Sequence, residues 1–150
     1  MKYTTQKDAA EKGIITDKMR EAAEYEGVGL EVIMEKLANG RAVLPANKNH
    51  KSILGRVVGE GFKTKINVNL GVSEDCCSMD KELEKVQMAI DMKADAIMDL
   101  STFGNTSLFR QKVIEMSPVM IGTVPVYDAI AKYGKKVEDI TVDEIGRAHV

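Results

Sequence analysis

The sequence predicts an α/β fold in which a helical amino-terminal region precedes a parallel β-sheet. Beyond Lys63, short strand-like segments alternate with amphipathic helical segments at a spacing of roughly thirty residues. Each predicted strand is followed by a predicted helix, as parallel neighbours require because they need a crossover connection. The first sixty or so residues lack this alternation and instead carry apolar residues at helical spacing.

Composition limits the class of protein. The chain has 150 residues, of which 44% are hydrophobic, which is enough for one domain with a hydrophobic core. The net charge of −2, with acidic and basic residues interspersed, argues against a nucleic-acid partner. The amino terminus is polar and the apolar runs are short, so we expect neither a signal peptide nor a membrane partner and place the protein in the cytoplasm.

The amino-terminal region, residues 1–62, is predicted to be helical with a later hairpin. Residues 17–27 predict a helix that ends at Gly27. Apolar residues at helical spacing predict a second helix, which stops at Asn39-Gly40: Leu30, Ile33, Met34 and Leu37. A short strand follows, and then a glycine-containing hairpin that lacks the Lys-Ser/Thr of a phosphate-binding loop.

Residues 63–144 are predicted to form three successive βα units. Strand 65–71 leads to helix 80–93, for which Ser78 or Asp80 supplies the cap. The second unit pairs a strand and a helix over residues 94–101 and 106–117, and the third does so over residues 119–127 and 128–134. We expect right-handed connections between these strands.

Two asparagines at alternate positions of strand 65–71 require an explanation, because asparagine is depleted in strands. Because side chains alternate along a strand, Ile66, Val68 and Leu70 are expected to lie under the helices. Lys65, Asn67 and Asn69 are then expected on the opposite face. In a closed (β/α)8 barrel that face is the interior, whose carboxyl-terminal mouth holds active sites. Amides buried there bond either to each other or to a ligand, and both readings stay open at this point.

Cysteine and histidine residues predict no metal site. The only cysteines, Cys76 and Cys77, are adjacent, which favours two reduced thiols in a loop over a C-x-x-C site. The only histidines, His50 and His149, lie far apart.

Four segments, in order and spacing, closely resemble the amino-terminal portion of the phosphomethylpyrimidine synthase (ThiC) family: "ANKNHKS", "GEGFKTKINVNLG", "ADAIMDLST" and "SPVMIGTVPVYDA". The likeness runs from about Tyr3 to about Glu144. It implies a (β/α)8 barrel with an amino-terminal domain. This chain would then hold the amino-terminal region, residues 1–62, and the first three βα units of a truncated barrel, residues 63–144.

The resemblance also implies a reaction. Family members use a 4Fe–4S cluster and S-adenosylmethionine to convert 5-aminoimidazole ribotide into 4-amino-5-hydroxymethyl-2-methylpyrimidine phosphate in thiamine biosynthesis. Zinc and a homodimeric full-length protein are implied as well. The family's substrate-contacting positions match Asn69, Met98 and Tyr127, and no residue of this chain is assigned to catalysis.

The chain lacks several features of the family pattern. The cluster-binding cysteine motif, the metal-binding histidines and roughly five of the eight barrel strands are absent. We therefore expect this segment to bind no cluster, S-adenosylmethionine or zinc, and to be inactive by itself. Residues 145–150, "IGRAHV", read as the translation of a common sequencing-adapter string, so His149 is given no functional weight.

Two alternatives remain open. After "MDLST" the chain continues "FGNTSLFRQ", which is similar to paralogues that make 5-hydroxybenzimidazole, a precursor of a cobalamin lower ligand, from the same ribotide. The alternative of another class is a non-catalytic module for ribotide binding or dimerisation. An enzyme predicts a reading frame that continues past Glu144, and a module predicts cooperative folding of the segment alone.

Overall fold

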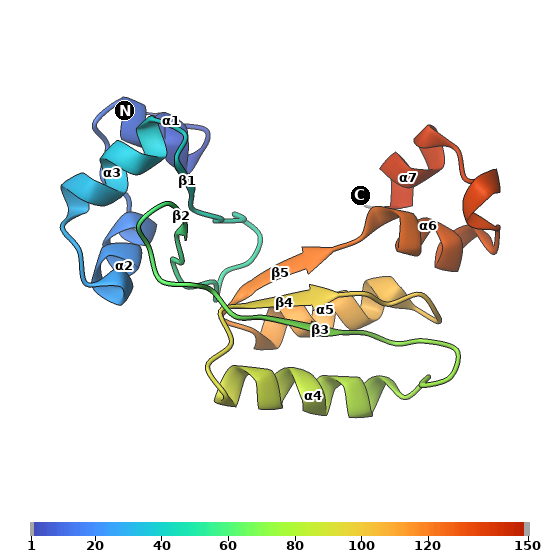
Figure 1. Cartoon of the computed structure of the whole chain (residues 1–150). Helices are drawn as coiled ribbons and strands as arrows, with labels where there is room; N and C mark the ends of the chain where they lie inside the picture. The colour runs from blue at the N-terminus through green and yellow to red at the C-terminus, as the bar shows by residue number, and fades with distance from the viewer. Residues whose placement is uncertain (1, 149–150) are drawn as a thin grey trace. The chain divides into compact units, whose positions relative to one another are not determined.

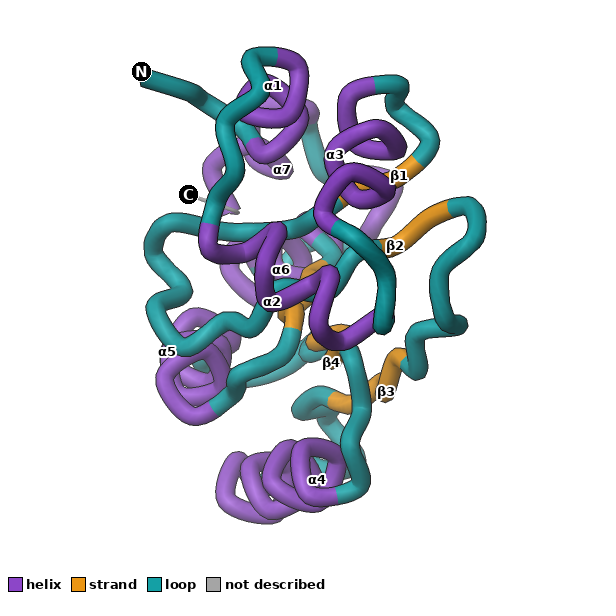
Figure 2. Tube along the Cα trace, turned by 90° about the vertical axis from the view of Figure 1, so that its left-hand side faces the viewer, coloured by secondary structure: helices purple, strands orange, loops and turns teal. Residues whose placement is uncertain are grey.

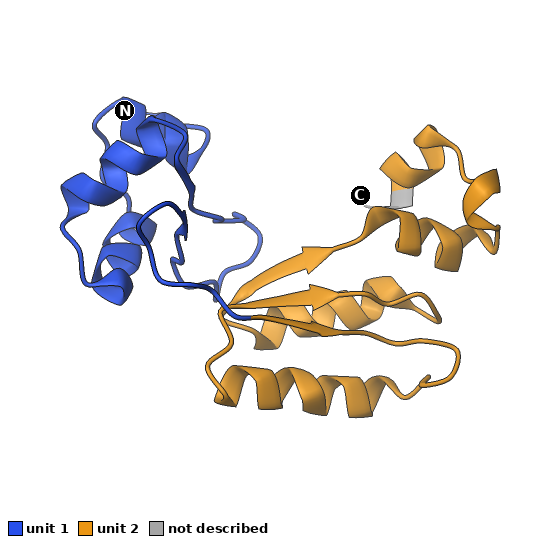
Figure 3. Cartoon of the chain, in the orientation of Figure 1, with its two compact units in different colours: residues 1–66 blue, residues 67–150 orange. Residues whose placement is uncertain are grey.

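The structure is a computed structural model that describes residues 2–148. The chain divides into two compact units, residues 1–66 and residues 67–150 (Figure 3). The first unit contains mainly helices, and the second combines helices with a parallel sheet (Figure 1). None of the helices in residues 2–148 combines the length and the apolarity needed to cross a membrane.

Three short helices build unit 1: α1 (Gln6–Glu11), α2 (Asp17–Glu26) and α3 (Leu30–Ala38). The side chain of Thr16 accepts a hydrogen bond from the Met19 backbone N–H and so caps the start of α2. Gly27 ends α2 with a φ of +74°, a conformation that glycine adopts without steric penalty. The predicted ends of both helices, at Gly27 and at Asn39, are confirmed.

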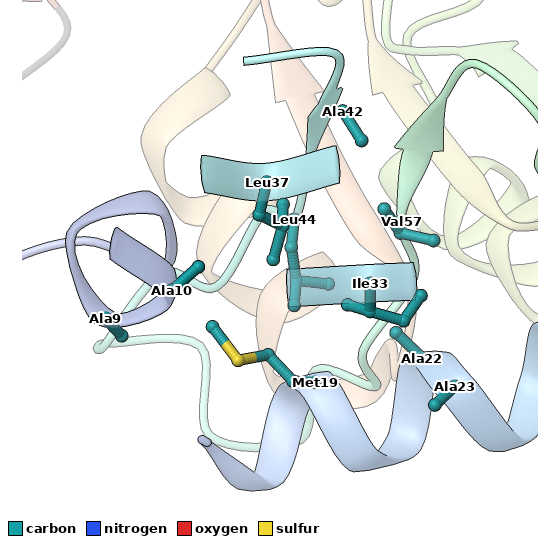
Figure 4. Packing of buried hydrophobic residues seen from close by; sticks show 10 residues of the cluster. All are labelled: Ala9, Ala10, Met19, Ala22, Ala23, Ile33, Leu37, Ala42, Leu44 and Val57. Atoms are coloured by element: carbon teal, nitrogen blue, oxygen red, sulfur yellow. The ribbon is translucent and has the colours of Figure 1, made fainter. Parts of the chain in front are cut away.

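The core of unit 1 lies between these helices and the segment that follows them (Figure 4). Its members are buried apolar side chains that Figure 4 labels: Ala9, Ala10, Met19, Ala22, Ala23, Ile33, Leu37, Ala42, Leu44 and Val57. Met19, Ile33 and Leu37 occupy the helical faces that the sequence spacing predicts. Most of the other members are alanines, which let the short helices approach closely.

The predicted glycine hairpin forms differently. β1 (Ala42–Val43) pairs antiparallel with β2 (Val58–Gly59), so the glycine-containing segment supplies one strand to a partner further back in the chain. A Cβ at Gly59 would lie 2.5 Å from the carbonyl oxygen of Arg41. The backbones therefore approach more closely there than any side chain allows, which explains the glycine at this position.

Glu21 ties α2 to the segment before β2 and makes unit 1 sensitive to acid. Its carboxylate accepts a hydrogen bond from Gly55 N–H at 2.6 Å and lies 2.9 Å from Lys18 Nζ, which also donates to the Ile53 carbonyl. Partial burial raises the pKa of Glu21, but the hydrogen bonds and charges of Lys18, Gly55 and Arg56 outweigh it and lower the pKa below its ordinary value.

We predict an acid-dependent loss of stability that passes through Glu21. Folding lowers the pKa of Glu21. Its contribution to the stability of the fold is therefore complete above the pKa that Glu21 has in the unfolded chain, about 4, and is lost as the pH falls through the folded pKa. Thermal unfolding between pH 3 and pH 6 or so should therefore show a shallower acid slope for Glu21→Gln than for the unmodified chain. The matched control Glu24→Gln, on the exposed face of α2, should keep the original slope. Equal slopes for all three proteins would contradict this assignment.

Unit 2 contains a three-stranded parallel sheet in the sequential order β3, β4, β5 (Figure 1). The strands are β3 (Asn67–Leu70), β4 (Ala96–Asp99) and β5 (Met120–Thr123). The helices of the unit are α4 (Met79–Asp91), α5 (Thr106–Met116), α6 (Pro125–Tyr133) and α7 (Val142–Ala148). A 3-10 turn, η1 (Val137–Asp139), precedes α7. The predicted α/β class with three successive βα units is confirmed, whereas closure into a barrel stays a prediction.

The core of unit 2 lies between the sheet and the pair α4 and α5, which cover the same side of the sheet (Figures 1 and 2). Its buried members are Leu70, Val72, Val86, Ala89, Ala94, Ile97, Phe109, Val113 and Val119. Ser78 caps α4 by accepting from Lys81 N–H, and Asn105 caps α5 by accepting from Leu108 N–H. Of the two predicted caps for α4, the structure selects Ser78.

Two expectations about the strands are wrong. The third strand was predicted to run to residue 127, but β5 ends at Thr123 and α6 begins at Pro125, because proline suits the first turn of a helix. Ile66 was predicted to pack under the helices, yet it is 59% exposed because β3 begins one residue later. Lys65 likewise lies outside β3, and its side chain pairs with Glu26 at 2.6 Å within unit 1.

The end of the described chain forms a capped helix. Thr141 and Glu144 form a capping box, with Glu144 accepting from Thr141 N–H at 3.0 Å and donating its own N–H to Thr141 Oγ1 at 3.3 Å. The Lys135 ammonium, with the N–H of Thr141, lowers the pKa of Glu144 to about 2. Residues 145–148 belong to α7, and His149 lies outside the described residues.

Candidate functional site

Asn69 and Met98 are neighbours on the face of the sheet opposite α4 and α5. Asn69 pairs in register with Met98, and Met98 pairs with Gly122 on β5. A Cβ at Gly122 would lie 2.7 Å from Met98 Cε and 2.8 Å from Met98 Sδ. The Met98 side chain therefore fills the space above Gly122, and one row across the sheet presents an amide, a thioether and bare backbone.

The amides of β3 bond to each other. Asn67 Nδ2 donates to Asn69 Oδ1 at 2.8 Å, and both residues are exposed. Each primary amide offers two donor hydrogens and one acceptor oxygen, so this bond uses one donor of Asn67 and part of the capacity of Asn69. The mutual bond orients the Asn69 side chain and does not use the donor hydrogens of its Nδ2.

The loops that follow β3 and β4 are joined directly after these residues. Leu100 N–H donates to the Leu70 carbonyl at 2.8 Å, and Thr102 N–H donates to the Val72 carbonyl at 2.9 Å. Between them, Val72 N–H donates to Ser101 Oγ at 3.0 Å. The carboxyl ends of both strands are thereby held in register beyond the sheet itself, which fixes the backbone from which Asn69 and Met98 project.

The buried carboxylate of Glu82 anchors the loop after β3 to α4. Glu82 on α4 is 1% exposed and accepts from Gly71 N–H at 3.1 Å. The other oxygen of Glu82 lies beside the Lys85 ammonium, which provides the counter-charge. Desolvation of this carboxylate is offset by the charged partner and by the backbone donor, so the first residue of the loop is anchored to the helix.

Tyr127, the third predicted contact residue, lies on the helix that follows β5. It lies in the first turn of α6, four residues after β5 ends, and is half-buried. The structure thus brings Asn69 and Met98 together as register partners and places Tyr127 on α6. The three predicted residues come from β3, β4 and α6 rather than from three strands.

Sequence reasoning missed a charged cluster in which the partly buried Arg110 pairs with the aspartates that directly follow Met98 and Tyr127. Arg110 Nη2 lies 2.7 Å from Asp128 and 3.2 Å from Asp99 Oδ2. Burial lowers the pKa of Arg110, but the hydrogen bonds and charges of Asp128 and Asp99 outweigh it and raise the pKa above its ordinary value. The available signal was an aspartate directly after both Met98 and Tyr127.

The cysteines do not fit an iron–sulfur cluster. A cluster that leaves one iron open for S-adenosylmethionine needs three thiolates, and the whole sequence has two cysteines. Cys76 Sγ lies 3.6 Å from Glu82 Oε1, and Cys77 is exposed. Within residues 2–148, no group of three or more histidine, cysteine, aspartate or glutamate residues is placed to hold a metal ion.

Unit 1 contains a cavity of about 740 Å³ whose lining comes from this unit alone. Its lining includes the buried His50 and three lysines, Lys18, Lys48 and Lys51. Lys18 is paired with Glu21, and Lys51 Nζ donates to the Lys48 carbonyl at 2.7 Å. Much of the positive charge in this cavity is therefore already engaged by the protein.

The fold and the row formed by Asn69, Met98 and Gly122 define the class of protein. It is an α/β protein whose sequential parallel strands present polar and soft apolar side chains together at their carboxyl ends. The sequence profile of the radical SAM ThiC family matches residues 5–149. The chain belongs to this family.

Relatives with curated names agree with this assignment. The chain is 59% identical over 145 residues to a phosphomethylpyrimidine synthase of Clostridium tetani, which covers 97% of this chain and 32% of the relative. It is 60% identical over 144 residues to the enzyme of that name from Alkaliphilus oremlandii, covering 96% of this chain and 33% of the relative. The chain spans about a third of the length of the curated relatives it matches.

Proposed function

We propose that this chain is the amino-terminal part of a phosphomethylpyrimidine synthase that converts 5-aminoimidazole ribotide into the hydroxymethylpyrimidine phosphate of thiamine biosynthesis. Membership of the radical SAM ThiC family and the names of the relatives support this proposal. The complete protein would be a cytoplasmic homodimer. The segment itself would be inactive, because its two cysteines cannot hold the cluster.

The observation that carries the proposal is the row of Asn69, Met98 and Gly122 on the face of the sheet opposite α4 and α5. In a closed barrel this face is the interior, and substrates bind at the carboxyl ends of the strands. Asn69 Nδ2 would donate to a polar group of the ribotide, and Met98 would form an adaptable apolar wall. Tyr127 would add a hydroxyl from the first turn of α6.

Radical chemistry would be supplied by a 4Fe–4S cluster and S-adenosylmethionine held, together with zinc, by the remainder of the complete protein. The residues of this chain would bind and orient the ribotide. Their contribution is to hold an amide, a thioether and a phenol in fixed positions, because a displaced contact weakens both binding and turnover.

The loop after β4 favours a second candidate, the synthesis of 5-hydroxybenzimidazole from the same ribotide. The segment "FGNTSLFRQ", which begins in this loop, is similar to paralogues that make that product. Both reactions begin with the same substrate, so the proposed contacts serve either. Product analysis of the complete protein by mass spectrometry distinguishes a pyrimidine from a benzimidazole.

We predict that removing the Asn69 amide and the Tyr127 hydroxyl weakens ribotide binding by the complete gene product. Each of Asn69→Ala and Tyr127→Phe should raise the Kd for the ribotide roughly 5- to 100-fold, the range expected for a lost buried hydrogen bond. The Kd for S-adenosylmethionine should not change, because other parts of the protein hold it. Isothermal titrations with 5-aminoimidazole ribotide and, separately, with S-adenosylmethionine measure the two dissociation constants.

The matched control is Gln111→Ala, which removes an amide from the exposed face of α5 and should leave ribotide binding unchanged. A double variant of Asn69 and Tyr127 that binds the ribotide as tightly as the unmodified protein would rule out the proposed site. Ribotide binding without any product in the loaded, reduced protein would instead favour a non-catalytic module.

A further inference from the structure

Three charged side chains from three elements meet beneath the carboxyl end of β4. Asp99 is the last residue of β4, Arg110 lies in the middle of α5, and Asp128 lies in the first half of α6. Their side chains are 0%, 16% and 4% exposed. One guanidinium charge is therefore shared by two carboxylates in a place where water screens their mutual repulsion only weakly.

Both carboxylates belong to residues that directly follow a proposed substrate contact in the sequence. Asp99 directly follows Met98, and Asp128 directly follows Tyr127. Asp99 also accepts a hydrogen bond from Ser101 N–H at 3.0 Å, which joins it to the loop after β4. One guanidinium thus connects the two backbone segments that carry two of the three proposed substrate contacts.

The packing of α6 makes this connection important. α6 packs mainly against α7, and its buried Ala129 lies beside Asp128 in the sequence. Asp128 is 2.7 Å from Arg110 Nη2, and this ion pair is a direct tie between α6 and α5. This ion pair therefore helps to fix the first turn of α6, and with it Tyr127, relative to α5.

We propose that Arg110 is a positioning residue of the ribotide site: it holds Met98 and Tyr127 in a fixed relation by binding the carboxylate next to each of them. This inference rests on the proposed function. Without the guanidinium, two buried carboxylates would repel each other and separate the start of α6 from the end of β4. Binding of the ribotide would then have to restore the arrangement, and affinity would fall.

The experiment compares three variants of the complete gene product. Arg110→Met removes the charge and keeps much of the apolar stem, whereas Arg110→Lys keeps a cation that can reach the carboxylates only in part. The matched control, Lys112→Met, removes a cation from the exposed face of the same helix. Circular dichroism first confirms that each protein is folded at the temperature used, and titrations then give the Kd for 5-aminoimidazole ribotide and for S-adenosylmethionine.

We expect the Kd for the ribotide to rise roughly 10- to 100-fold in Arg110→Met, as for a displaced contact, and to recover in part in Arg110→Lys. The Kd for S-adenosylmethionine should remain unchanged in both, and Lys112→Met should match the unmodified protein. Should Arg110→Met not fold, Arg110→Lys and the isosteric Asp128→Asn supply the measurement, with a smaller but still selective loss of ribotide affinity expected, because each keeps a weaker contact between α5 and α6.

Other outcomes overturn the inference. Unchanged ribotide binding in a folded Arg110→Met protein would remove Arg110 from the site, and an equal loss of affinity for both ligands would reduce it to a general structural role. The unmodified protein tests the proposed function separately: if it does not bind the ribotide, the proposed function fails and this inference fails with it. If it binds the ribotide and the variants show no selective loss, only the inference fails.

Discussion

Replacing Gly71 with alanine is expected to destabilise the joined loops after β3 and β4 by about 2 to 4 kcal/mol. An alanine Cβ would lie 2.5 Å from Ser101 N and 2.8 Å from the Leu100 carbonyl carbon. Both are backbone atoms, so no side chain can rotate away and the strand ends themselves must separate. Gly71 also has a φ of +151°, a backbone conformation in which any side chain is disfavoured.

Hydrogen exchange measures this effect where it should arise. The amides of Leu100 and Thr102 donate to the carbonyls of Leu70 and Val72, so they report directly on the separation of the two loops. Gly104→Ala is the matched control, because Gly104 has a positive φ of +73° but nothing within 4 Å of an added Cβ. It should cost about 1 kcal/mol from backbone strain alone. Equal protection of the two amides in Gly71→Ala and in the unmodified protein would contradict the close approach.

Truncating Phe109 to alanine is expected to lower the free energy of unfolding of unit 2 by about 3 to 5 kcal/mol. Phe109 on α5 is 0% exposed and lies in the cluster that contains Ile97 and Val113. The large loss follows because the variant removes apolar area from the core and leaves a cavity that a small sheet with two covering helices cannot close.

Urea-induced unfolding followed by far-ultraviolet circular dichroism gives the size of the loss. The neighbouring Leu108 is 42% exposed, so Leu108→Ala removes a similar apolar side chain from the same helix with far less burial. Its effect should stay below about 1 kcal/mol. A loss for Phe109→Ala no larger than that for Leu108→Ala would show that the core between the sheet and α5 is not packed as described.

The sequence predicted α2, α3, α4 and α5 well, because their signals are local, whereas α1 and α7 have no counterpart among the predicted helices. Ser78 precedes an amphipathic segment and caps α4, and Gly27 ends α2 through a conformation that other residues avoid. Errors arose where a local pattern had two readings. Residues 124–127 are β-prone and follow a strand, but Pro125 fits the start of α6 equally well, and the structure chooses the helix.

At the candidate site, too, the sequence predicted what depends on local pattern and did not predict contacts between distant residues. Alternation in "INVNL" was sufficient to predict that Asn67 and Asn69 leave the helix side of the sheet, and both are exposed in the structure. No sequence pattern predicted that Met98 fills the space above Gly122, because that contact depends on the register between β4 and β5. The joining of Asp99 and Asp128 through Arg110 was equally out of reach, since the three residues come from three elements.

By itself, the sequence determined the order of helices and parallel strands, the faces on which apolar residues lie, and the resemblance that the family match confirms. These properties depend on residues that are near one another in the chain. Only the tertiary structure decided which side chains meet across the sheet, how the loops after β3 and β4 join, and which charged side chains pair. Such contacts bring together residues distant in sequence, and their geometry is set by register and packing rather than by local propensity.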